Sequence, residues 1–93
     1  MIKGYRDRDT EKLARGEGPR RLPPDIQRCA RMRLDRIDAA VVLEDLRVSP
    51  SHHLEALRGD RAGQHSIRIN EQWRSCFEWR DGHAYNVEVV DYH

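Results

Sequence analysis

The longest run of helical periodicity lies in the first half of the chain. From Asp25 to about Ala40, apolar residues recur at three- and four-residue steps and charged residues fill most of the remaining positions. This spacing places an apolar stripe along one side of a helix that packs against another layer. The stripe consists of Ile26, Ala30, Leu34 and Ile37. Pro24 suits a first helical turn and predicts where this helix begins.

Weaker signals flank this helix. Residues 2–6 alternate mildly and predict a short first strand, and residues 10–12 resemble the start of a short helix that stops at Gly16. Residues 16–24 hold two glycines and three prolines without an apolar period, which predicts a loop. Residues 41–46 predict a further short helical segment that ends before Ser49-Pro50.

Beyond Pro50 the pattern changes from helical to alternating. The predicted strands cover residues 53–57, 65–70, 73–79 and a last stretch from Tyr85 to the chain end. Their apolar side consists of Ile67, Ile69, Trp73, Phe77, Trp79, Tyr85, Val87 and Val89. Turns are predicted at Gly59–Gly63 and at Asp81-Gly82, which is a two-residue hairpin signal.

Helices followed by strands predict an α+β fold, with the N-terminal helices packed on one face of a largely antiparallel sheet. A chain of 93 residues fits a single domain over residues 1–93, with about 60–65% of its extended surface buried. Such a thin domain needs helices on only one face of its sheet. We therefore expect the other face to be available for binding.

Composition and charge exclude several classes of protein. A hydrophobic fraction of 38% and a charged fraction of 35% suit a folded protein with a charged surface, and the net charge of +1 identifies no ligand. No run approaches the roughly 18 apolar residues that span a bilayer, so we expect a cytoplasmic protein without a membrane segment. Cys29 and Cys76 lie far apart and are expected to be reduced thiols. The five histidines have no established ligand spacing, so neither a metal ion nor a cofactor is expected.

Arginine dominates the basic residues. Fifteen of the seventeen are arginine, whose planar fork matches phosphate and carboxylate. A GC-rich genome produces the same bias, so position is more informative than content. The arginines on or beside the predicted strands are Arg58, Arg61, Arg68 and Arg74, with Glu55, Asp91, Tyr92 and His93 as possible neighbours.

These residue types fit the cleavage of RNA without a metal ion. One group takes the proton of the 2′-hydroxyl, another protonates the leaving 5′-oxygen, and a cation stabilises the phosphorane between them. Arginines and glutamates on an exposed sheet face are also common as plain solvated residues. From composition alone, a catalytic surface and a solvated face both stay open.

A sequence motif favours the catalytic surface. Residues 59–74 read Gly-Asp-Arg-Ala-Gly-Gln-His-Ser-Ile-Arg-Ile-Asn-Glu-Gln-Trp-Arg, and a strand containing phenylalanine, an Asp-Gly turn and a terminal Asp91-Tyr92-His93 follow. With Met1-Ile2-Lys3 and residues 37–40, nearly the whole chain resembles the HigB toxins of the RelE superfamily. The resemblance implies a RelE-like, microbial-ribonuclease-like fold and the toxin of a type II toxin–antitoxin system.

The resemblance also implies an activity and partners. The expected activity is a ribosome-dependent, metal-independent endoribonuclease that cleaves mRNA in the A site by attack of the 2′-hydroxyl and thereby inhibits translation. The expected partners are the ribosome, mRNA and a co-encoded HigA-type helix-turn-helix antitoxin. We expect the free toxin to be monomeric and its antitoxin complex to be of higher order, with the 16–24 loop as one candidate docking segment.

The resemblance implies roles for individual residues of this chain. Arg74 matches the arginine that stabilises the transition state, and Asp91, Tyr92 and His93 match the terminal catalytic triplet. Arg58 stands where relatives place a lysine that contacts phosphate, and this change keeps the charge but alters the donor geometry. Arg61 and Arg68 are the further phosphate-binding candidates. His93 also carries the terminal carboxylate, which favours its protonated form and a general-acid role.

The chain departs from the family pattern at Glu55. Relatives have a histidine there that helps in proton transfer. The reference pKa of a glutamate is about 4.3, whereas that of a histidine is about 6.5. We therefore predict a competent but attenuated toxin. His52 and His53 lie just upstream and are expected in a loop, although a shift in the alignment with the family places His53 at the site instead.

Two other functions stay open at this point. A non-catalytic ParE-type toxin shares the fold and inhibits DNA gyrase by binding, but those relatives lack the Asp-Tyr-His ending. A regulatory module that binds RNA without cleaving it is the second. Trp73, Phe77 and Trp79 can stack on bases in such a module, but their alternation beside isoleucines favours a place in the core.

Overall fold

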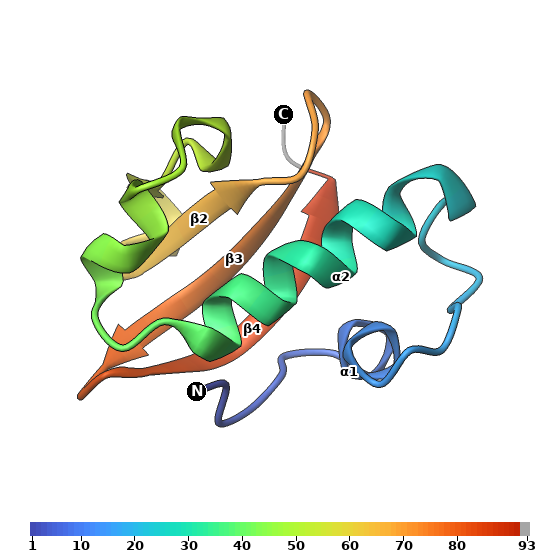
Figure 1. Cartoon of the computed structure of the whole chain (residues 1–93), viewed down its shortest axis with the longest axis horizontal. Coiled ribbons are helices and arrows are strands. Elements are labelled where there is room, and N and C mark those ends of the chain that lie inside the picture. The colour runs from blue at the N-terminus through green and yellow to red at the C-terminus, as the bar shows by residue number, and fades with distance from the viewer. Residues whose placement is uncertain (92–93) are drawn as a thin grey trace.

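The chain forms two α-helices that lie on one face of a four-stranded antiparallel sheet. This computed structural model describes residues 1–91. The elements are α1 (Arg8–Ala14), α2 (Pro24–Ala39), the 3₁₀ turns η1 (Leu43–Arg47), η2 (Pro50–His52) and η3 (Gly59–Arg61), and the strands β1 (Glu55–Ala56), β2 (Gln64–Arg68), β3 (Trp73–Arg80) and β4 (His83–Asp91). The strand order is β1-β2-β3-β4. Figure 1 shows α2 crossing the sheet over β3 and β4, with α1 beside it. The predicted α+β architecture is confirmed.

The two helices begin at the residues that local chemistry favours. Pro24 occupies the first turn of α2, and all four residues of the predicted apolar stripe are buried. α1 begins earlier than predicted because its N-cap is Asp7, whose carboxylate accepts hydrogen bonds from the backbone N–H and the hydroxyl of Thr10. Within residues 1–91, no helix is long and apolar enough to cross a membrane.

The core fills the space between the helices and the sheet. It joins the stripe of α2 to side chains from α1, from the segment after α2 and from three strands. Its buried members are Leu13, Leu22, Ile26, Ala30, Leu34, Ile37, Ala40, Leu46, Ile67, Ile69, Trp73, Phe77, Ala84, Val87 and Val89. The predicted core positions of Trp73 and Phe77 are confirmed, and Trp79 packs against the same cluster while partly buried.

The hairpin between β3 and β4 has the predicted turn and an unpredicted bulge. Asp81 and Gly82 both have positive φ angles, of 52° and 80°, as a type I′ turn requires. The register then shifts between Cys76 and Glu78, at the level of Asn86 (φ 52°). The bulge adds one residue to β4 and so reverses the alternation of its side chains. Tyr85 therefore pairs with Glu78 and projects from the face of the sheet opposite to that of Val87. The prediction that Tyr85 shares the side of Val87 and Val89 was wrong.

Both edges of the sheet differ from the prediction. Residues 2–6 form two isolated parallel bridges instead of a strand, Ile2 with Ala84 and Tyr5 with Val87, and they cover the outer edge of β4. The opposite edge strand, β1, has only two residues because the chain before it is turned: His53 has a left-handed backbone (φ 45°, ψ 54°). Covered and short edges resist pairing with other chains.

Candidate active site

The face of the sheet away from the helices carries a row of four paired residues. Glu55 pairs with Ser66, Ser66 with Cys76, and Cys76 with Glu88, one residue from each strand. Directly paired residues project from the same face, and neighbouring strands lie about 4.8 Å apart. This cross-strand row therefore has a carboxylate at each end and two small side chains between them.

Arg74 lies beside the row and is held in one orientation. Its Nε donates to the hydroxyl of Ser66 at 2.8 Å, and its Nη2 donates to the carbonyl oxygen of His53 at 2.7 Å. Its Nη1 lies 3.2 Å from Oε1 of Glu55. Although it projects from the open face, only 14% of the side chain is exposed. The structure thus brings Arg74 and Glu55, two of the predicted site residues, together.

A second ionic cluster lies at the other end of the row. Glu88, with 12% of its side chain exposed, is 2.6 Å from Nη1 of Arg61 and 3.7 Å from Nε of Arg6. The same Nη1 of Arg61 also donates to Gln64. Arg61 therefore reaches from η3 to the far strand, β4. Glu88 was missed by the sequence reasoning because its alternation is typical of any solvated glutamate.

Between the two clusters, Cys76 is fully buried. Burial raises the pKa of its thiol to about 11. The thiol is therefore protonated at neutral pH and is a poor nucleophile. Cys76 is therefore an uncharged residue between the two ionic clusters.

The other phosphate-binding candidates differ in their surroundings. Arg58 is exposed at the N-cap of η3. Arg68 pairs with Arg74 across β2 and β3, and its Nε donates to the backbone oxygen of Asn70. Arg61 and Arg68 each form an ion pair, with Glu88 and with Glu71.

The terminal residues of the predicted site are only partly described. Asp91 pairs with Trp73, so its side chain leaves the strand on the helix-covered side, where Oδ2 accepts from Nε2 of Gln72 at 2.8 Å. The register that pairs Arg74 with Val90 therefore does not direct Asp91 to Arg74. Tyr92 and His93 lie outside the described residues.

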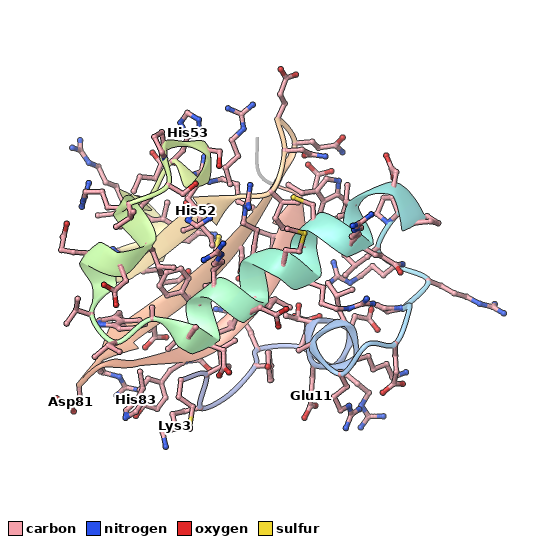
Figure 2. All side chains as sticks on the ribbon, viewed as in Figure 1. Lys3, Glu11, His52, His53, Asp81 and His83 are labelled. Atoms are coloured by element: carbon pink, nitrogen blue, oxygen red, sulfur yellow. The ribbon has the colours of Figure 1, made fainter. Side chains whose placement is uncertain are left out.

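The two upstream histidines have different surroundings. His52 is 4% exposed, its Nδ1 is 3.1 Å from the carbonyl oxygen of Leu46, and burial lowers its pKa. His53 is exposed and contributes its carbonyl oxygen to Arg74. Figure 2 labels both, with His52 nearer to α2. In residues 1–91, no group of three or more His, Cys, Asp or Glu side chains is arranged to hold a metal ion.

Helices on one face of an antiparallel sheet and an arginine–carboxylate cluster on the other define a RelE-like α+β protein. The crystal structure of YafQ from E. coli strain BL21(DE3) has this fold: the two structures align with a TM-score of 0.56, over 98% of this chain and 93% of that one, at 12% sequence identity. At this identity the likeness concerns the fold alone.

The sequence comparisons show the family. Residues 3–93 match the HigB-like toxin family, described as the RelE-like toxin of the type II toxin-antitoxin system HigB, and the chain belongs to this family. Toxin HigB-1 of Vibrio cholerae serotype O1 is 36% identical over 88 residues, which are 94% of this chain and 93% of that protein. Endoribonuclease HigB of Proteus vulgaris is 38% identical over 61 residues, covering 66% and 65%. The resemblance stated from the motifs is confirmed.

Proposed function

We propose that this toxin is an endoribonuclease that cleaves mRNA in the ribosomal A site and thereby inhibits translation. The observation that carries the proposal is the guanidinium of Arg74, fixed on the uncovered face within 3.2 Å of the Glu55 carboxylate. An oriented cation beside a carboxylate supplies two of the three groups that this reaction uses, a base and a charge that stabilises the phosphorane. The name of the Proteus vulgaris relative, Endoribonuclease HigB, supports the same activity.

The proposed reaction uses side chains and no metal ion. A base takes the proton of the 2′-hydroxyl, Arg74 stabilises the phosphorane, and an acid protonates the leaving oxygen, which gives a 2′,3′-cyclic phosphate and a 5′-hydroxyl. Glu55 is the preferred base because it lies beside Arg74, whereas Asp91 leaves β4 on the other side. The roles proposed for His93, as the acid, and Tyr92, in positioning the substrate, rest on the family resemblance.

The three other candidate arginines have a separate proposed role. Arg58, Arg61 and Arg68 bind phosphates that flank the scissile one and so align the strand over Arg74. So few catalytic groups need the ribosome to orient the 2′-hydroxyl for in-line attack. We further propose that a HigA-type helix-turn-helix antitoxin binds and silences this chain in the cytoplasm, and that the free toxin is monomeric.

Primer extension on mRNA from programmed ribosomes tests the proposal. We expect Arg74→Ala to lower the cleavage rate by about 10²- to 10³-fold, because it removes the donor that stabilises the transition state. Arg80→Ala is the matched control: this arginine lies on the same strand and its guanidinium lies 4.2 Å from the ring centre of Tyr85. Control and wild type are expected to cleave alike.

Two outcomes contradict the nuclease proposal. Wild-type cleavage by Arg74→Ala removes Arg74 from the mechanism. Inhibition of DNA gyrase supercoiling by the wild-type chain, with no mRNA cleavage, replaces the nuclease with the ParE-type alternative.

A further inference from the structure

Among the described residues, two groups outside the predicted catalytic set contact Arg74. The Ser66 hydroxyl, which is fully buried, accepts from Nε, and the carbonyl oxygen of His53 accepts from Nη2. Both acceptors are neutral, so they orient the guanidinium and leave its charge in place. Glu55 differs, because it neutralises Arg74 and is itself 51% exposed.

The contacts of Arg74 involve different nitrogen atoms of its guanidinium. Nε and Nη2 face the protein, through Ser66 and His53. Nη1 faces Glu55, at the more exposed end of the row. An arginine side chain has many rotamers when it is free, and contacts on two edges select one of them. Electrostatic catalysis needs such a donor to be aligned before the reaction begins.

The contribution of His53 comes from its main chain. Its φ of 45° and ψ of 54° are left-handed, a conformation that non-glycine residues adopt infrequently. This turn at the end of η2 directs the carbonyl oxygen of His53 to Arg74 across 21 residues of sequence. Asn and Gly adopt the same backbone conformation readily, whereas β-branched residues do not.

We propose that the Ser66 hydroxyl and the His53 carbonyl are positioning groups that preset Arg74 for the scissile phosphate. This inference rests on the proposed nuclease function. Ser66 is too deeply buried to contact RNA itself, so it acts through Arg74 and presents the Nη1 edge to substrate.

The test is single-turnover mRNA cleavage on programmed ribosomes. Ser66→Ala is expected to lower the maximal rate at least about tenfold, the factor that one hydrogen bond to a charged group carries, at an unchanged half-saturating ribosome concentration. The matched control is Ser75→Ala on β3: this serine is equally buried, its hydroxyl has no hydrogen-bond partner among the described residues, and it faces the helices. It is expected to cleave at the wild-type rate.

A double-mutant cycle separates positioning from a structural role. In an Arg74→Lys background, which lacks the Nε–H donor, Ser66→Ala is expected to cause no further loss. An undiminished loss in that background, or equal rates for Ser66→Ala and Ser75→Ala, overturns the inference. If Arg74→Ala itself retains full activity, the nuclease proposal fails; if Arg74→Ala is inactive and Ser66→Ala is fully active, only the positioning role fails.

Substitutions at His53 test its main-chain role. His53→Asn and His53→Gly keep the carbonyl and tolerate the backbone conformation, so both are expected to retain the wild-type rate, whereas His53→Val is expected to lower it. A loss of activity in the Asn and Gly variants overturns the assignment, since it makes the imidazole the required group. Thermal unfolding of each variant identifies any loss caused by misfolding.

Discussion

Glu55 has two relations to the proposed reaction, and both depend on its carboxylate. The family resemblance predicts that it stands in place of a histidine, and it forms an ion pair with Arg74. As a base it is weaker than imidazole, whose reference pKa is about two units higher. As an anion it competes with phosphate for Nη1 of Arg74. Both relations lead to the same expectation of an attenuated toxin.

Glu55→His is therefore expected to cleave faster than wild type in single-turnover assays on ribosomes, by up to about tenfold, because it supplies a stronger base and removes the competing anion. Glu44→His is a suitable control, since Glu44 lies in η1 with a side chain that is 68% exposed, and it pairs with Arg47, which has no proposed role in cleavage. A slower Glu55→His variant means that the carboxylate itself is required.

At the level of elements, α1 is too short to be stable alone, since isolated helices need about 12–15 residues. Its seven residues are held by groups at its N-terminus. Asp7 caps the helix and pairs with Arg21, whose Nη2 also donates to the carbonyl oxygen of Val89 on β4. The hydroxyl of Thr10 accepts from the N–H of the same valine. The cap thus connects the helix, the 16–24 loop and the sheet.

We expect Asp7→Ala to lower the free energy of unfolding by about 1–2 kcal/mol, because it removes the cap acceptor. Asp7→Asn, which keeps an acceptor oxygen, is expected to lose less. Asp9→Ala serves as the control: it removes a partner of Arg21 without touching the cap, and a partly exposed ion pair contributes only about 0–1 kcal/mol. Urea denaturation measures all three, and equal losses for Asp7→Ala and Asp9→Ala contradict the capping role.

The hairpin shows how far an element can be predicted. Asp81-Gly82 was identifiable because a type I′ turn needs two residues that tolerate positive φ. Asn86 was not, because a bulge depends on how β4 pairs with β3. The candidate site divides in the same way. Arg74 and Glu55 were found through the family resemblance, whereas Ser66 and Glu88 were not identified, since only the register brings arginines to them.

At the scale of the whole molecule, the two sides of the sheet are stabilised differently. The helix side is an apolar core, and the open side depends on buried polar groups and ion pairs. Two histidines lie on the helix side. His52 is buried against Leu46, and the ring centre of the partly buried His65 on β2 lies 6.2 Å from that of Phe77. Burial lowers the pKa of each imidazole.

Stability is therefore expected to depend on pH. Because the pKa of these histidines is lower in the folded state, the unfolded chain binds protons at a higher pH than the folded chain does. The histidine contribution to stability is therefore fully present above the unfolded-state pKa of about 6.5. It is lost as the pH falls through the folded-state pKa values. Urea denaturation at about pH 7.5 and about pH 5.5 measures the loss. His52→Asn is expected to reduce the difference. Identical stabilities of wild type at the two pH values contradict the prediction.

The sequence by itself determined the central elements and the sides that α2 and β3 bury. The stripe of α2, the alternation of β3 and the turn at Asp81-Gly82 are local patterns, because a helix or strand with one buried face repeats its apolar residues at its own period. The motif at residues 59–74 likewise identified Arg74 as a candidate site residue.

Only the tertiary structure decided which strand positions face one another. A shift of one residue moves every side chain of a strand to the other face, and nothing in the local pattern of β2 or β4 records its partner. That register aligns Glu55, Ser66, Cys76 and Glu88 in one row. It also allows Arg61 to contact Glu88 and the carbonyl oxygen of His53 to contact Arg74. They are contacts between residues distant in sequence, and folding alone brings them together.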